Sequence, residues 1–136
     1  MPLIRSESQG GGDVCNFYAD DENLDAQLRK WYAAMRELIP KLSERLPNTK
    51  VWGLTSHASL CLMSEPEYDA GDNHVIIEHY YDGCFRMSCH PPGGELPIPD
   101  SHITFVAFGV AEALDRILLG MTASKGWPNS NDLPSC

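Results

Sequence analysis

The chain has 136 residues, of which 43% are hydrophobic, and its formal net charge at pH 7 is −9. This length predicts one globular domain, and this apolar fraction argues against global disorder. An acidic surface repels phosphate backbones and anionic lipids, so nucleic acids and membranes are excluded as expected partners and a basic protein is favoured.

The two ends of the chain are rich in glycine, serine, proline and asparagine. They predict a flexible arm over residues 1–13 and a flexible tail over 126–136, around a single domain at 14–125. Trp127 is expected to pin the start of the tail to this domain. The arm lacks the apolar stretch of a secretory signal, and five irregularly spaced cysteines favour reduced thiols, so a cytoplasmic location is expected.

Apolar residues recur every three or four positions from Asp21 to Leu46, which predicts an amphipathic α-helix. Pro40 lies inside this pattern and predicts a kink, or a break into a long helix and a short one. Acidic residues at the start of the helix complement its dipole: Asp20, Asp21, Glu22 and Asp25.

Alternating apolar residues predict extended structure over 51–63, as either one bent strand or a short hairpin. Strands are also predicted over 74–81 and 84–90, because Asp82-Gly83 between them is a strong signal for a two-residue hairpin turn.

A closing helix is predicted from Asp100 or Ser101 to about Leu119, with Gly109 allowing close approach to the sheet and Gly120 as its stop. The order of elements indicates an α+β fold. We expect an antiparallel meander of three to four strands, with the long kinked helix and the closing helix packed on one face.

A two-residue turn places Tyr81 opposite Cys84. The same register gives two further pairs, His79 with Arg86 and Glu78 with Met87. The face expected to join the core carries mainly apolar residues: Ile76, Tyr80, Phe85, Met87 and Cys89, with Glu78 among them. The opposite face then presents an exposed cluster of His79, Tyr81 and Arg86, residue types that suit a protein contact.

The density of histidine and cysteine in this hairpin suggests a metal site, but strand geometry argues against one. Cys84 and Cys89 are an odd number of positions apart and point to opposite faces. Cys84 and His90 share a face but lie about 20 Å apart at roughly 3.3 Å per residue, too far to share zinc. No metal and no cofactor is therefore expected.

Two catalytic alternatives remain open. A thiol nucleophile could form from Cys61 with His79, or from Cys89 with His57. If Glu78 is buried in the core, its pKa should be raised, as for a general acid. No nucleotide-binding, hydrolase or metalloprotease motif accompanies these residues.

The segment from 64 to 73 is acidic and contains no basic residue. Its spacing does not match a calcium-binding loop. It is a candidate surface for a basic protein, through five residues: Glu65, Glu67, Tyr68, Asp69 and Asp72.

In size, charge and helix–meander–helix order from Asp21 to Met121, the chain resembles the small acidic immunity proteins of bacterial toxin–immunity systems. The resemblance implies a non-enzymatic inhibitor that binds a basic toxin or effector. Its contact surface would be the acidic segment together with His79, Tyr81 and Arg86. The alternatives are a small cytoplasmic enzyme, and an adaptor or structural subunit that dimerises through an exposed sheet edge.

Overall fold

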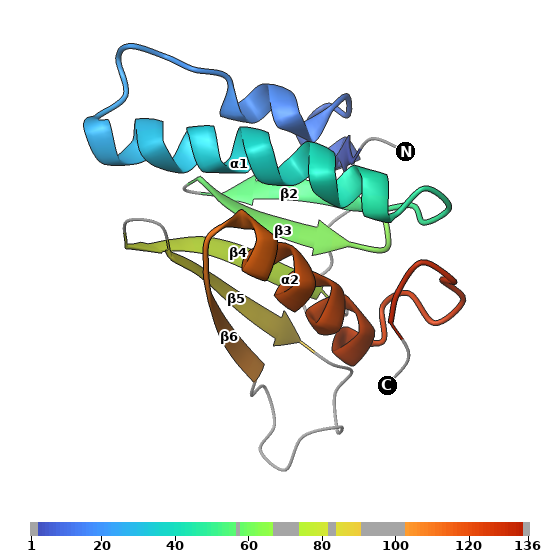
Figure 1. Ribbon diagram of the computed structural model, residues 1–136. Helices are drawn as coiled ribbons and strands as arrows, with labels where there is room; N and C mark the ends of the chain where they lie inside the picture. The colour runs from blue at the N-terminus through green and yellow to red at the C-terminus, as the bar shows by residue number, and fades with distance from the viewer. Residues whose placement is uncertain (1–2, 57, 67–73, 82–83, 91–102, 135–136) are drawn as a thin grey trace.

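The computed structural model describes residues 3–56, 58–66, 74–81, 84–90 and 103–134, and only the backbone at 8, 74, 79–81, 90 and 103. Six strands form one sheet in chain order, and both helices lie on the same face of it (Figure 1). The strands are β1 (Ile4–Arg5), β2 (Trp52–Ser56), β3 (Ser59–Met63), β4 (His74–Tyr81), β5 (Cys84–His90) and β6 (Ile103–Phe108). The helices are α1 (Ala26–Arg45) and α2 (Val110–Ser124), with short 3₁₀ turns η1 (Glu7–Gln9) and η2 (Val14–Tyr18) before α1.

The α+β class is confirmed, but the antiparallel meander of three to four strands is wrong. β1 pairs with β2 in parallel, and each of the other neighbouring pairs is antiparallel. The sheet is therefore mixed. The additional strands come from both ends of the domain, where the sequence predicted a flexible arm and a helix.

Helix α1 begins at Asp25, whose carboxylate accepts a hydrogen bond from the Leu28 N–H at 2.8 Å. This cap places the helix start after the acidic cluster instead of within it. The helix runs through Pro40 as one element, so a break is wrong and the kink stays a prediction. Pro40 is exposed while its neighbours Ile39 and Leu42 are buried, so core packing on both sides holds the helix together across the missing N–H.

The segment 51–63 is a hairpin, which settles the choice between a bent strand and two short ones. Its turn contains Ala58 at a φ of 69°, a left-handed conformation that is uncommon for alanine. Two side chains from the helical layer hold this turn. The Tyr18 hydroxyl donates to the Ala58 carbonyl at 3.0 Å, and the Trp31 indole N–H donates to the same oxygen at 2.7 Å.

The closing helix predicted from residue 100 or 101 is wrong over its first third. Ile103–Phe108 is strand β6, and α2 starts only at Val110. Gly109 separates them with a φ of 85°, a conformation that favours glycine. Gly120 lies buried inside α2 instead of ending it, and the helix ends at Lys125 in the left-handed conformation.

The register of the β4–β5 hairpin shifts between His79 and Tyr81. Tyr81 lies opposite Cys84, as predicted. Beyond the shift, His79 lies opposite Phe85 and Glu78 opposite Arg86, so both of the other predicted pairs are wrong. An extra residue on one strand is a β-bulge, and it moves the following residues to the other face.

This bulge changes which residues of β4 join the core. Val75 and Ile77 are fully buried, whereas Ile76 and Glu78, predicted on the core face, are only half-buried. On β5, which has no extra residue, the predicted core residues are confirmed: Phe85, Met87 and Cys89.

Parts of both chain ends pack on the domain. Leu3 is 2% exposed. Trp127 is buried and donates its indole N–H to the Lys50 carbonyl at 3.0 Å, which confirms that it pins the tail. Asp132 accepts hydrogen bonds from the Asn48 N–H and the Thr49 hydroxyl. The flexibility of residues 1–13 and 126–136 stays a prediction.

Within the described ranges, neither helix combines the length and the apolar character that crossing a bilayer requires.

Candidate functional site

For most residues of the predicted contact surface, the structure does not describe the side chain. Four of its residues lie outside the described ones: Glu67, Tyr68, Asp69 and Asp72. Of His79 and Tyr81 the structure describes the backbone alone, in β4. Glu65, just after β3, and Arg86, in β5, are both exposed.

The structure does not bring His79 and Arg86 opposite each other, because the β-bulge lies between the two strands at this level. Arg86 instead has Glu78 opposite it on β4 and Val106 opposite it on β6. On this face Arg86 therefore neighbours β6 and not His79 near the tip of the hairpin.

We call the sheet face opposite the helices the second face. The pairing of the strands traces one row across it, through residues directly opposite one another: Leu54, Cys61, Ile76, Ser88 and Thr104. A shorter row beside it contains Glu78, Arg86 and Val106. The first row is mainly apolar, unlike the polar surface usual on the outer face of an antiparallel sheet, whereas the shorter row carries two charged residues beside Val106.

Exposure on the second face increases toward β6. Cys61 and Ser88 are buried, at 8% and 5% exposed. Val106 is 38% exposed and Phe108 is 58% exposed. Together with the exposed Arg86 and Thr104, they form what we call the β6 patch: Arg86, Thr104, Val106 and Phe108.

The β6 patch was missed from sequence because residues 103–108 were assigned to a helix. Val106 then falls inside the predicted closing helix. The signal that could have found it is composition, since Ile-Thr-Phe-Val-Ala-Phe is made mostly of β-branched and aromatic residues typical of strands.

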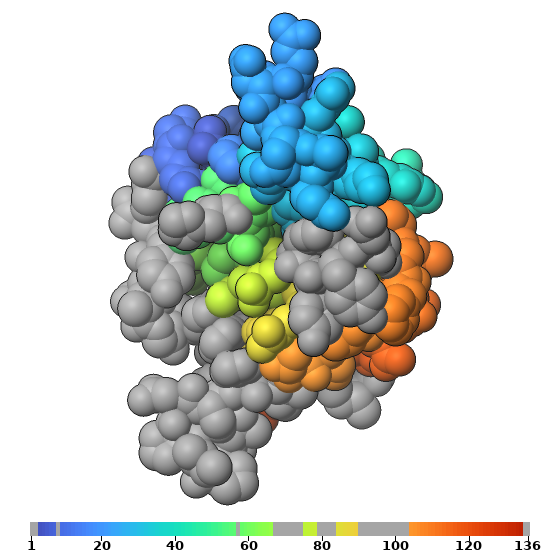
Figure 2. Space-filling view, turned by 90° about the vertical axis from the view of Figure 1, so that its left-hand side faces the viewer, coloured from blue at the N-terminus to red at the C-terminus, as the bar shows by residue number. Residues whose placement is uncertain are grey.

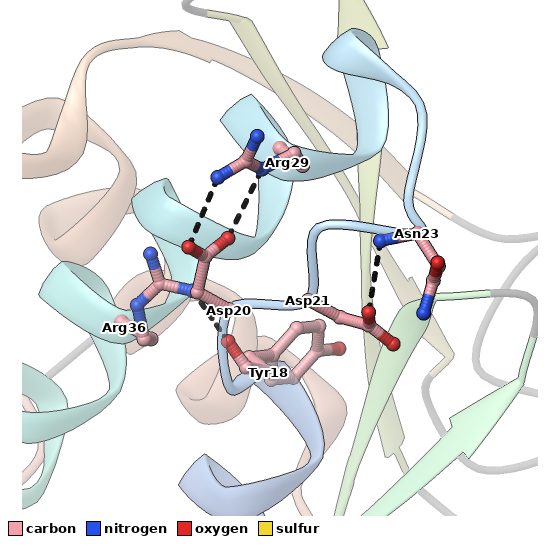
Figure 3. A network of polar contacts seen from close by, with 6 residues as sticks. All are labelled: Tyr18, Asp20, Asp21, Asn23, Arg29 and Arg36. Carbon is pink, nitrogen blue, oxygen red and sulfur yellow. Dashed lines mark hydrogen bonds and ion pairs between the residues drawn. The ribbon is translucent and has the colours of Figure 1, made fainter.

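A second charged region lies at the start of α1, where the chain projects from the body of the molecule (Figure 2). The Asp20 carboxylate accepts two hydrogen bonds from the Arg29 guanidinium, each at 3.1 Å (Figure 3). These bonds lower the pKa of Asp20. Asp21 accepts from the Asn23 N–H at 2.9 Å, and Arg36 donates to the Tyr18 carbonyl at 2.7 Å (Figure 3).

The acidic residues of this region thus serve local structure. Asp20 joins the loop to the helix, Asp21 closes a turn, and Asp25 caps the helix. Their shared role is to shape the entry into α1, and they do not converge on an open site.

The two thiols considered as nucleophiles, Cys61 and Cys89, are both buried. Burial raises the pKa of Cys61 to about 12 and the pKa of Cys89 to about 11. The Cys89 thiol donates to the Gly120 carbonyl at 3.2 Å. A thiol of this kind stays protonated near neutral pH, and the thiolate is the reactive form. His57, the proposed partner of Cys89, lies outside the described residues.

Glu78 does not occupy the core position on which a raised pKa depended. It is half-buried on the second face, opposite Arg86.

The part of the chain that the structure describes contains no group of three or more His, Cys, Asp or Glu side chains that could hold a metal ion. A shallow hollow of about 300 Å³ lies where the tail meets the domain. Its lining includes Thr49, Lys50, Glu65 and Trp127. Trp127 and Thr49 already hold the tail in place through hydrogen bonds, so this hollow is a by-product of that packing.

Comparison with known proteins adds no family to this picture. A scan against protein-family models found no match, and searches of curated proteins and of solved structures found none either.

Proposed function

We propose that the chain is a non-enzymatic protein-binding domain that inhibits or sequesters a basic protein partner, in the manner of immunity proteins. The observation that carries this proposal is the β6 patch, in which Val106 and Phe108 are 38% and 58% exposed beside an exposed Arg86. Aromatic residues and arginine are enriched at protein interfaces, where a few such side chains carry most of the binding energy.

The rigidity of the patch supports this function. Its residues lie on two paired strands, with Arg86 opposite Val106 and Cys84 opposite Phe108. A surface held by a sheet loses little conformational entropy on binding. A partner that covers Val106 and Phe108 would bury their remaining exposed area, and each would contribute part of the roughly 1.5–3 kcal/mol gained by fully burying a large apolar side chain.

The charge of the chain selects the class of partner. At −9 it attracts a basic protein over long range and accelerates encounter, while the apolar patch supplies the short-range contact. Binding of this type is salt-dependent in its association rate and weakly salt-dependent in its dissociation rate.

The test is co-expression with the product of the adjacent reading frame in the source genome, followed by a binding measurement with the two purified proteins. We expect the chain to neutralise that product and to bind it. Phe108→Ala should weaken binding at least tenfold, which corresponds to about 1.4 kcal/mol. Leu119→Ala is the matched control, because Leu119 is also exposed, at 44%, but lies on α2.

Equal loss of binding in both variants would remove the β6 patch from the proposal. Absence of neutralisation and of binding by the unmodified chain would overturn the proposed function itself.

A further inference from the structure

The outer edge of β6 is a second, different feature of the same strand. β6 is the last strand in the sheet, and its ladder with β5 runs from Cys84 opposite Phe108 to Cys89 opposite Ile103. In an antiparallel ladder, alternate residues turn their N–H and C=O groups away from the neighbouring strand. Among the residues described, no strand pairs with β6 on that outer side.

The sequence of β6 lacks the devices by which natural edge strands avoid pairing. Ile103–Phe108 contains no charged residue, no proline and no glycine, and it is six residues long. Edge strands are commonly protected by lysine, proline, a bulge or short length. An uncharged segment of β-branched and aromatic residues is instead the type that pairs with its own kind.

The opposite edge of the sheet shows how the same chain protects a strand. β1 has only two residues, Ile4–Arg5. Its outer side is closed by the chain itself, since the Arg5 N–H donates to the Gly12 carbonyl at 2.6 Å and the Val14 N–H donates to the Leu3 carbonyl at 3.1 Å. β1 is therefore short and covered, whereas β6 is long, apolar and without charge.

We propose that β6 pairs antiparallel with β6 of a second copy of this chain. A two-fold axis perpendicular to the sheet would join the two six-stranded sheets into one continuous sheet. Both helical layers then lie on the same side of the joined sheet, and the two second faces become one surface.

Matching of the two faces favours a second copy as the occupant of this edge. Residues directly opposite each other in an antiparallel pair share a face. A strand that pairs with β6 must therefore offer apolar residues on both sides. β6 itself does so, with Phe105 and Ala107 toward the helices and Val106 and Phe108 on the second face.

Charge also favours self-pairing at this edge. Two copies with a net charge of −9 each repel one another, and the repulsion is least where the contacting strand carries no charge. This inference concerns the assembly of the chain and stands independently of the proposed function. It also places the two β6 patches side by side, which doubles the surface available to a partner.

The test is the mass of the purified full chain by sedimentation equilibrium over a wide range of concentration. We expect the mass to rise from 15.1 kDa toward twice that value as concentration increases. Val106→Lys introduces a charge at the edge and should raise the dimer dissociation constant at least about tenfold, because like charges brought together across paired strands repel. Leu119→Lys, the same type of change on α2, should leave it unchanged.

Thr104→Lys provides a second edge variant, and circular dichroism checks that each variant is folded. A wild-type chain that stays monomeric at every concentration would overturn the proposal. So would a dimer that survives both lysine substitutions in β6.

Amide hydrogen exchange separates edge pairing from stacking of the two second faces. Edge pairing slows exchange of the outward N–H groups of β6 as concentration rises. A dimer in which these amides remain unprotected would exclude the continuous sheet.

Discussion

The two faces of the sheet differ sharply at the middle of β5, although Cys84 and Ser88 on the second face are also buried, at 1% and 5% exposed. Phe85 and Met87 on the helix-covered face are at most 2% exposed, whereas Arg86 between them is exposed on the second face. The helix-covered face carries the packing that stabilises the fold. The second face near β6 can change at little cost in stability, and so it is the face on which recognition can evolve.

The largest expected effect on stability comes from a substitution on the helix-covered face. Phe85→Ala should lower the free energy of unfolding by about 3–5 kcal/mol, since it removes a buried ring and leaves a cavity. The Phe85 ring lies 5.4 Å from the Trp31 ring, so the substitution also loses an aromatic contact between β5 and α1. Urea unfolding measures the change. A loss below 1 kcal/mol, the range of an exposed site, would contradict the contrast between the faces.

The next effect uses two glycines at the contact between the sheet and the helical layer, Gly53 in β2 and Gly120 in α2. A Cβ added at Gly53 would lie 2.8 Å from Val14 Cγ2 and 2.9 Å from Leu60 Cδ1. Gly53→Ala should therefore destabilise the fold by about 1–3 kcal/mol through overpacking. Gly120→Ala is the control, because its Cβ would lie at an ordinary 3.6 Å from Val75 Cγ1 and inside a helix. Chemical denaturation of both variants should show opposite signs, and equal losses would show that the packing at Gly53 is not tight.

A smaller effect on stability is expected from a buried residue of the second face, and it tests whether this face is exposed throughout. Cys61 lies on this face but is buried, and its pKa is raised from 9.0 to about 12. The unfolded thiol ionises first, so the stability contributed by the protonated thiol is complete below about pH 9 and is lost as pH rises toward 12. By pH 10 the loss should reach about 1 kcal/mol.

Unfolding measured from pH 7 to pH 10 checks this expectation. Cys61→Ala should flatten the alkaline slope whatever its effect at pH 7. An unchanged slope would show that Cys61 is accessible to solvent and that the second face is open throughout.

The smallest expected effect on stability comes from Arg86→Ala. It removes an exposed side chain from the second face and should change the free energy of unfolding by no more than about 0.5 kcal/mol. The same variant should weaken partner binding measurably, which calorimetry can detect. A large loss of stability instead would mean that Arg86 serves the fold and not the contact.

The elements predicted correctly from sequence have either a hydrophobic pattern that repeats over many residues or a strong turn signal. The buried face of α1 repeats from Trp31 to Leu42, over about three turns. The ends of β4 and β5, Tyr81 and Cys84, lie where the Asp-Gly turn signal predicts them. At Pro40 the packing of buried residues compensates for the lost backbone hydrogen bond. The sequence around Pro40 does not reveal this packing.

The failures have two physical causes. Ile103, Val106 and Val110 fit helical spacing although a strand and a helix meet between them, and only Gly109 marks the junction. The bulge before Tyr81 adds one residue to the ladder and reverses the faces of β4 without any change in its alternating pattern.

Both errors, the wrong helix over 103–108 and the missed bulge in β4, also affected the prediction of the candidate site. Arg86 was predicted and is exposed, but Val106 and Phe108 became visible only once β6 was identified as a strand at the edge of the sheet. The orientation and edge position of a residue depend on pairing across the sheet, and a local pattern does not contain that information.

The parallel pairing of β1 has a consequence for the synthesis of the protein. Ile4 pairs with Trp52, so β1 leaves the ribosome before its partner strand β2 and cannot pair with it until α1 has followed. The other neighbouring strands are successive in the chain and can pair as each hairpin emerges. β1 is thus paired late although it is translated before β2, and the nascent chain must keep Leu3 and its neighbours available until the β2–β3 hairpin is made.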